Sequence, residues 1–466
     1  MNPDNLRIQN SRIRVLNDKL VRKGEYILYW MQQSQRTEYN HALEYAVELA
    51  NHFDLPLYVL FVLVADYPEA NLRHYTFMLE GLLDVQQSLL RRGIAMSVKI
   101  GDRDRILREA EKRAAAVVCD MGYLRHQRLW RKILGQNSGC RVICVESDAV
   151  VPVETASPKM EYGAYTLRPK INRLLEAYLR EVPETPVKKE LSIRKIQGID
   201  PKNPEKVLDA FSAQNIDRSV PSVSRLFPGG TTHAKHRVEE FIKNRAAGYA
   251  ENSNQPQTDD VSHIGPYLHF GQISPLYLAL KMRGEGTLTG EVKQRFLEQI
   301  IVRRELSINF VYYNPDYDHF GCLPGWAAQT LTSHLGDKRD YVYTRGQLEA
   351  AETHDPYWNA SLKEMKHTGY MHNYMRMYWA KKVIEWSKSP EDAFKTLLYL
   401  NNKYFLDGRD PNSYAGVAWA FGLHDRPWKE RPIFGMVRYM AATGLERKCD
   451  IRAYVEKVEA GIPVSD

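Results

Sequence analysis

The stretch YILYW, Tyr26–Trp30, is an uninterrupted apolar run that predicts a strand buried on both faces. Four similar runs follow it: PLYVLFVLV, AMSVKI, AAVVCD and RVICVE. Amphipathic stretches that predict helices separate them, near residues 40–51, 74–91, 103–113 and 125–134. This alternation is typical of a doubly wound parallel α/β sheet, in which a ligand crevice lies at the carboxyl ends of the strands. The region contains no GxGxxG or Walker loop, so a classical dinucleotide or P-loop site is not indicated.

The second half of the chain has a different pattern. Between about Val182 and Pro228 the sequence is charged and punctuated by proline, as in EVPETPVKKE and GIDPKNPEK, which is typical of a connection between domains. Beyond Thr231 helical periodicity dominates, so we predict an almost all-α domain. The predicted organisation is an N-terminal extension at 1–24, an α/β domain at 25–180, a linker at 181–228 and a helical domain at 229–466.

Composition narrows the class of protein. The 466 residues carry a net charge of +7, an excess that matters for nucleic acid only if it is concentrated on one face. The five cysteines show no spacing typical of a disulfide framework or a zinc site, which favours a reducing cytoplasm and predicts no metal. Neither a signal peptide nor an apolar run long enough to span a membrane is present. We expect a monomer.

Tryptophan is concentrated near the C-terminus. Five of the eight tryptophans lie between His354 and Trp428. In the helix predicted for MHNYMRMYWAKKVIEW, Trp379 and Trp386 share one face and are separated by roughly 10 Å along the axis. Together with Trp358 they could relay an electron between a buried redox cofactor and the surface. Apolar stripes usually form cores, so the spacing alone favours core packing over a relay.

Polar residues next to these tryptophans suggest a cofactor. Arg376 lies in the same predicted helix, and a buried arginine needs a carboxylate, for which Asp407 in the DGRDPN turn is a candidate. Such a pair suits the edge of a flavin ring, and the amide of Asn401 is able to donate or accept near flavin N5. DGRDPN is equally an ordinary surface turn. Upstream, VSHIGPYLHFGQIS begins with small residues before a predicted helix, which suits a pyrophosphate but is also a common helix entry.

Several long segments resemble the class II cyclobutane pyrimidine dimer photolyases of the photolyase/cryptochrome superfamily. These segments are GPYLHFGQIS, FVYYNPDYD, THDPYWNAS, MHNYMRMYWAKKVIEW and LDGRDPNSYAGVAW. The resemblance extends from RIRVLN and ILYWMQQSQR near the start to FGMVRYM near the end. It implies an α/β antenna domain, a helical FAD domain, and deoxyribodipyrimidine photo-lyase activity on UV-damaged DNA. A second antenna chromophore, deazaflavin or folate, is also implied, but no residue pattern identifies it.

The resemblance also implies roles for individual residues. Trp379 would donate to FAD, active as FADH−, with Trp358 and Trp386 completing a chain and Tyr343 a further donor. The implied FAD-binding residues are Tyr249, Val261, Ser262, Ile264, Gly265, Arg376, Asn401 and Asp407. Gly265 stands where the family more often has serine. The implied contacts to the flipped dimer and to DNA are Met377, Trp419, Arg303, Arg426, Trp428 and Arg438, with Lys429 and Arg431 as further cations.

The chain departs from the family pattern around the lesion. In FLEQIIVRRELSINF, Gln299 stands where the family has a catalytic glutamate that contacts the dimer. A neutral amide donates hydrogen bonds but delivers no proton, so we expect binding to be retained and the repair yield to fall. Arg303 occupies a position that is tryptophan in some members, and the AWAFGLHDRPW stretch is one residue shorter than the family pattern.

Two other interpretations stay open at this point. A cryptochrome-like flavin photoreceptor with little repair activity is favoured by Gln299, while Asn401, Trp419 and the end of the chain at Asp466, which leaves no long signalling tail, speak against it. The second of these interpretations is a nucleotide-binding α/β protein with an unrelated helical domain.

Overall fold

The computed structural model describes residues 7–65, 67–191 and 216–461. The chain forms two compact units, each built from several segments. The first unit comprises residues 1–158, 169–236 and 264–286, and the second comprises residues 159–168, 237–263 and 287–466. The described parts of the predicted linker, residues 181–191 and 216–228, fall within the first unit, and residues 192–215 lie outside the described residues. The predicted domain boundaries therefore stay a prediction.

The first unit contains a six-stranded sheet with the strand order β1-β6-β5-β2-β3-β4. The strands are β1 (Ile13–Val15), β2 (Tyr26–Trp30), β3 (Leu57–Leu63), β4 (Ala95–Ile100), β5 (Ala114–Asp120) and β6 (Arg141–Val145). All neighbouring pairs except β1 and β6 are parallel. Every residue of β2, β3 and β5 is buried, as expected for strands covered on both faces. The five predicted parallel strands and the doubly wound class are confirmed.

Strand β1 was not predicted, since the first strand was expected at Tyr26. Its three residues pair antiparallel with β6 at the edge of the sheet and are only partly buried. A strand in such a position needs no run of apolar residues, so the sequence lacks the pattern that predicted the other strands. Long-range contacts hold the strand in place. Arg12, which precedes it and is 1% exposed, donates hydrogen bonds to the carbonyl oxygens of Glu146, Ala149 and Val150.

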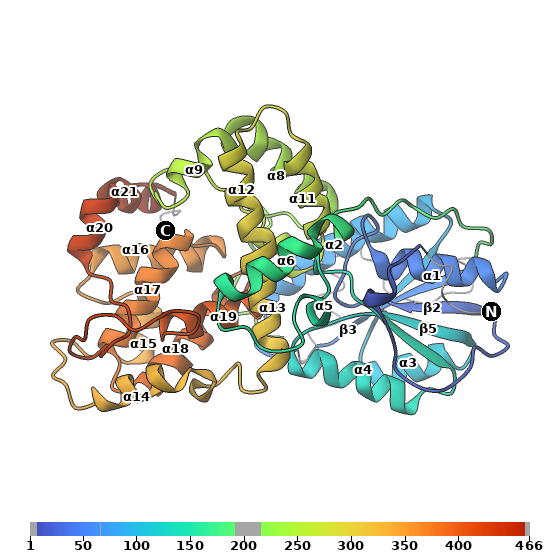
Figure 1. Cartoon of the computed structure of the whole chain (residues 1–466), viewed down its shortest axis with the longest axis horizontal. Coiled ribbons are helices and arrows are strands. Elements are labelled where there is room, and N and C mark those ends of the chain that lie inside the picture. Colours follow the sequence, from blue (N-terminus) through green and yellow to red (C-terminus); the bar gives the residue numbers. More distant parts are fainter. Residues whose placement is uncertain (1–6, 66, 192–215, 462–466) are drawn as a thin grey trace. The chain divides into compact units, whose positions relative to one another are not determined.

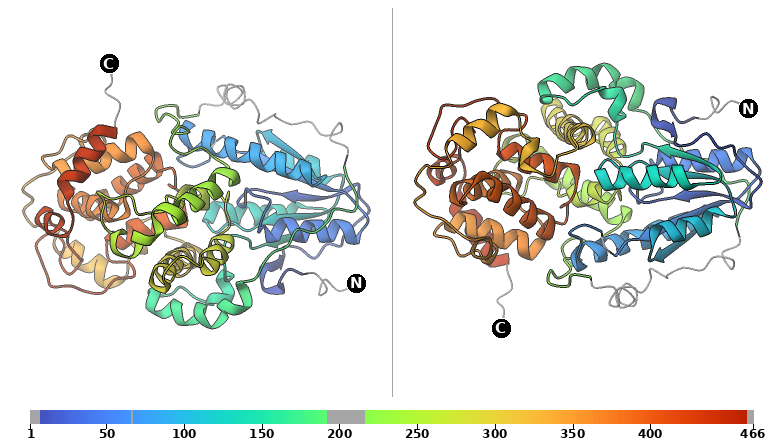
Figure 2. Two further views of the ribbon diagram at one scale, coloured as in Figure 1. Left: turned by 90° about the horizontal axis from the view of Figure 1, so that it is seen from above. Right: turned by 90° about the horizontal axis from the view of Figure 1, so that it is seen from below.

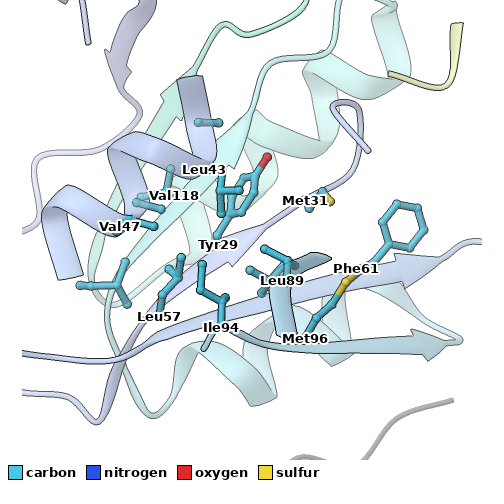
Figure 3. Packing of buried hydrophobic residues seen from close by; sticks show 14 of the residues in the cluster. Tyr29, Met31, Leu43, Val47, Leu57, Phe61, Leu89, Ile94, Met96 and Val118 are labelled. Atoms are coloured by element: carbon cyan, nitrogen blue, oxygen red, sulfur yellow. The ribbon is translucent and has the colours of Figure 1, made fainter. Parts of the chain in front are cut away.

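Helices cover both faces of this sheet (Figure 1), with α1 against β2, α2 against β4 and α4 against β6. The helices of this region are α1 (His41–His52), α2 (Leu72–Arg91), α3 (Arg103–Glu111), α4 (Arg125–Asn137), α5 (Val153–Ala156) and α6 (Ala164–Tyr178). Asn40 caps α1 by accepting the N–H of Leu43. Figure 3 shows part of the core, with Tyr29 of β2, Leu43 of α1 and Leu57 of β3 packed together.

The rest of the described chain is helical, as predicted. Its helices are α8 (Thr231–Asn244), α9 (Tyr249–Asn252), α10 (Gly265–His269), α11 (Pro275–Gly284), α12 (Gly290–Leu297), α13 (Arg304–Tyr313), α14 (Gly325–Ser333), α15 (Arg345–Ala350), α16 (Pro356–Thr368), α17 (Asn373–Trp386), α18 (Pro390–Tyr404), α19 (Pro411–Ala420), α20 (Ala442–Lys448) and α21 (Ile451–Gly461). The helices from α16 onward are orange to red in Figure 2. Ser389 caps α18 ahead of Pro390, which is the first residue of the helix. Among the described residues, no helix combines the length and apolar character needed to cross a bilayer.

Candidate functional site

One pocket of the second unit gathers residues that the sequence singled out. It encloses about 760 Å³ of space between atoms, its open mouth included. Helices α17 and α19 supply most of its wall, α18 contributes Asn401, and Phe405, Asp425 and Arg438 complete it. Its lining includes six predicted site residues: Arg376, Met377, Trp379, Asn401, Trp419 and Arg438. Two of the predicted cofactor contacts, Arg376 and Asn401, therefore line the same space as three of the predicted substrate contacts, Met377, Trp419 and Arg438.

The predicted pairing of Arg376 with Asp407 is confirmed. Nη2 of Arg376 lies 3.0 Å from Oδ1 and 3.2 Å from Oδ2 of the carboxylate. The Nε–H of Arg376 donates to the carbonyl of Met371, and its guanidinium carbon lies 3.8 Å from the ring centroid of Phe405. These contacts fix a cation at the pocket wall, while the partner Asp407 lies in the turn that follows α18.

Asn401 is held at the pocket by a tight turn. Its side chain is 5% exposed, and its Nδ2–H donates to Oδ1 of Asn402, which also accepts the backbone N–H of Arg409. The turn brings Gly408 against α18, where a Cβ at residue 408 would lie 2.8 Å from the carbonyl oxygen of Asn401. Only glycine allows this approach, so the glycine in DGRDPN positions the amide rather than marking a surface turn.

Three tryptophans lead away from the pocket. Trp379 lines it and is 2% exposed, and its Nε1–H is buried without a hydrogen-bond partner among the described residues. The carbonyl oxygen of Trp379 accepts the Nε1–H of Trp358 at 3.0 Å. The ring of Trp358 lies 5.7 Å, centroid to centroid, from that of Trp386. Burial of all three fits core packing as well, but their order from pocket outward is the order that a relay requires.

The file of aromatic rings continues past Trp386 to a less buried tyrosine. The ring centroid of Tyr343 lies 5.5 Å from that of Trp386, and the backbone N–H of Tyr343 donates to the carbonyl of Trp386 at 3.1 Å. Tyr343 is only half buried. The sequence placed it as a further donor, and its position at the outer end of the file is compatible with that role.

Five further residues that were predicted to bind FAD lie in two short helices, at the cap of one of them, and in the loop between them. Tyr249 begins α9 and packs against Phe241 and Phe296, and burial raises the pKa of its hydroxyl. Val261 and Ser262 lie in the following loop. Ile264 and Gly265 begin α10, which has only five residues, and they belong to the first unit. Their roles stay predictions.

The region around Gln299 is π-helical, over Glu298–Arg303. Gln299 and Arg303 are exposed, and neither of them lies among the described residues that line the pocket. Glu298 accepts hydrogen bonds from Arg168 and Arg303. Burial opposes ionisation of Glu298, but the hydrogen bond and charge of Arg168 and the charge of Arg303 outweigh it and hold the pKa of Glu298 below its ordinary value. Glu298 is therefore a paired, ionised carboxylate. It does not supply the proton that a glutamate at position 299 would supply.

The segment with Arg426, Trp428 and Arg438 forms an exposed cationic and aromatic surface. Trp428 is 42% exposed, and the guanidinium carbon of Arg438 lies 4.4 Å from its ring centroid. Arg426 flanks the same ring at 5.9 Å. Asp425 accepts the Nε1–H of Trp428 at 3.3 Å and lies 3.4 Å from Arg438. Stacked cations and an exposed indole suit phosphates and a base face.

Lys381 is a pocket residue that sequence reasoning missed. It lies one turn beyond Met377 on α17, is 4% exposed, and donates to the carbonyl of Ala420. Burial lowers the pKa of its ammonium to about 7, with Asp425 opposing the shift and Arg438 adding to it. The sequence could have indicated this position, because Lys381 follows Met377 by four residues and such residues share a helix face.

Comparisons with known proteins show which family this chain resembles. Residues 27–188 match the family model for DNA photolyase. A deoxyribodipyrimidine photo-lyase of Methanothermobacter thermautotrophicus is 45% identical over 456 residues, which cover 97% of this chain and 98% of that protein. One from Arabidopsis thaliana is 37% identical, covering 98% of this chain and 94% of that protein. The crystal structure of a class III photolyase from Agrobacterium tumefaciens has the same fold, with a TM-score of 0.72 at 20% identity over 94% of this chain and 87% of that chain.

Proposed function

This chain belongs to the DNA photolyase family, and we propose that it is a class II enzyme that uses light to split cyclobutane pyrimidine dimers in DNA. The observation that carries the proposal is the pocket, because Arg376 and Asn401 line it together with Met377 and Trp419. Residues suited to a flavin thus face the same space as residues suited to a pair of bases. Direct electron transfer to a bound lesion requires such proximity.

The pocket fits a flavin cofactor on two grounds. Trp379, whose buried Nε1–H has no hydrogen-bond partner among the described residues, and the buried Asn401 both line space that protein does not fill. The guanidinium of Arg376, fixed by Asp407, supplies positive charge that favours an anionic ring. Arg376, Asp407 and Asn401 would hold the ring of FAD, and Tyr249, Val261 and Ser262 would belong to the same binding site. When bound, the reduced flavin FADH− supplies the photoexcited electron that splits the dimer and then receives it back.

The chain's own residues bind and orient the lesion. A dimer is poorly stacked and paired, so flipping it out of the duplex costs less than flipping normal bases. Met377 and Trp419 offer apolar contacts that exclude water from the flipped bases. Trp428 would enter the gap in the duplex, and Arg426 and Arg438, which lie beside its ring, would hold the flanking phosphates.

Recharging of the flavin is assigned to the tryptophans. Trp379 would donate first, Trp358 would refill it, and Trp386 would refill Trp358. The hydrogen bond from Trp358 to the carbonyl of Trp379 and the ring contact between Trp358 and Trp386 support this order. The antenna chromophore, the monomeric state and a cytoplasmic location stay predictions.

A photoreceptor with little repair activity is the second candidate, and Gln299 is the observation that favours it. The decisive experiment exposes the chemically reduced protein and a Gln299→Glu variant to blue light with an oligonucleotide that contains one dimer. We expect the wild type to split the dimer and the variant to do so with higher yield, since only the glutamate carries a proton. Repair by the variant alone would favour the photoreceptor, and repair by neither would refute the enzymatic function.

A further inference from the structure

Tyr343 and His354 form a hydrogen-bonded pair at the outer end of the aromatic file. The phenol oxygen of Tyr343 lies 2.8 Å from Nδ1 of His354, and it also accepts the backbone N–H of His354 at 3.0 Å. Tyr341 stacks on the imidazole at a centroid distance of 3.6 Å. His354 is exposed and Tyr343 is half buried, so the pair connects the file to solvent.

The geometry assigns the protons within the pair. An amide N–H only donates, so the phenol oxygen acts as acceptor toward the backbone of His354. The single phenol proton is then free to point at Nδ1. In a neutral imidazole with a donor at this distance, Nδ1 carries the lone pair and the ring proton is on Nε2. Tyr343 is therefore already hydrogen-bonded to a base before any electron leaves it.

We propose that His354 is the base that accepts the phenol proton of Tyr343 when Tyr343 is oxidised, a step that rests on the tryptophan relay of the proposed function. An electron passes from Tyr343 to the oxidised indole of Trp386, and the O–H bond of Tyr343 breaks as an Nδ1–H bond forms on His354. The products are neutral Trp386, a neutral tyrosyl radical and an imidazolium. One electron and one proton leave Tyr343, and both are accounted for.

Charges around Trp386 favour this direction of transfer. The ammonium of Lys382 lies 5.6 Å from the Trp386 ring centroid and opposes a positive charge there, although its ion pair with Glu385 moderates the effect. The imidazole of His354 lies 5.1 Å from the same ring. Once protonated, it adds a second positive charge beside Trp386, so the hole does not return easily. The exposed imidazolium then releases its proton to water.

The test is flash photolysis of the flavin-loaded protein with oxidised flavin, recorded as the absorption of tryptophan and tyrosyl radicals. A His354→Gln variant keeps a polar side chain and the backbone contact but removes the base. We expect formation of the tyrosyl radical to slow by roughly a hundredfold, the typical effect of losing a positioned base, with a longer-lived tryptophan radical. The matched control is Tyr341→Phe, which keeps the stacked ring and should behave as wild type.

The experiment distinguishes failure of the proton transfer to His354 from failure of the tryptophan relay. A tyrosyl radical that forms in His354→Gln at the wild-type rate overturns the role of His354, and so does a wild type that forms no tyrosyl radical. Absence of the tryptophan radical in the wild type means that the relay itself has failed. A Tyr343→Phe variant identifies the radical, because its signal must disappear there. Flavin content and repair by the chemically reduced variants report that folding is unaffected.

Discussion

At the scale of single residues, Trp379 carries the most specific assignment, because it alone of the three relay tryptophans lines the pocket. Trp379→Phe removes the easily oxidised indole and keeps an aromatic ring. We expect flavin photoreduction to fall by roughly tenfold or more, while the chemically reduced variant repairs dimers as well as wild type. Trp130→Phe, in α4 of the first unit, is the matched control and should photoreduce normally. Unimpaired photoreduction in Trp379→Phe would reject its role as first donor.

Lys381 gives a second test at this scale, through the pH dependence of stability. Its pKa is about 7 in the folded protein and about 10.4 when unfolded. Between these values unfolding takes up a proton, so this residue makes stability rise with pH, by at most about 1.4 kcal/mol per pH unit. Below the lower of these two pKa values, Lys381 is protonated in both the folded and the unfolded state, and it no longer makes the unfolding free energy depend on pH.

Lys381→Met should therefore flatten the increase in unfolding free energy across that window, as measured by urea denaturation. Lys382→Met leaves Lys381 in place and should keep the slope. Identical slopes in wild type and Lys381→Met would show that the lysine is not deprotonated in the folded pocket.

The residues differ in how far sequence alone could place them. The partnership of Arg376 and Asp407 was predictable, since a semi-buried arginine needs a carboxylate and the glycine turn offered one. The hydrogen bond between Tyr343 and His354 was not, because ten residues of loop and helix separate the two and no periodicity relates them. The π-helical turn that contains Gln299 was not predicted either, because it differs from an α-helix only in its backbone hydrogen bonds.

At the scale of elements, Asp355 joins α16 to α17. Its Oδ1 accepts the N–H groups of Tyr357 and Trp358 at the start of α16, and its Oδ2 accepts the hydroxyl of Tyr378 in α17. Asp355→Ala removes a cap, about 1 kcal/mol, and a buried hydrogen bond to a charged group, about 1.5–3 kcal/mol. We expect urea denaturation to show a loss of about 2–4 kcal/mol.

Ser389→Ala is the matched control, because Ser389 caps α18 in an exposed position and bonds no second helix. It should cost only about 1 kcal/mol. Equal losses in the two variants would show that Asp355 does not hold the two tryptophan-bearing helices together.

The elements themselves were largely predictable from apolar periodicity. The helix predicted near residues 40–51 is α1, which is capped by Asn40, and Ser389 caps α18 in the same local way. Strand β1 was missed because it is short and at an edge, and its position is set by the contacts of Arg12 with a segment more than a hundred residues away. Local pattern carries no information about such a partner.

At the scale of the whole molecule, a net charge of +7 matters through its distribution. If Arg426 contacts a DNA phosphate, Arg426→Gln should weaken binding of both damaged and undamaged duplex and reduce the slope of log affinity against log salt by about 0.9. Fluorescence anisotropy over a salt series measures this slope. Lys112→Gln, in the first unit, removes the same charge and should leave the slope unchanged. An effect of equal size in both variants would mean that only total charge matters.

The central claim is that this protein uses light to split pyrimidine dimers with an electron from the flavin beside Arg376 and Asn401. The most direct measurement is the count of dimers remaining in a defined oligonucleotide after incubation with the chemically reduced protein, under blue light and in the dark. The account predicts loss of dimers in the light only, with bases restored and no net consumption of reductant. A protein that binds flavin and the oligonucleotide yet leaves the dimers intact in the light would contradict it.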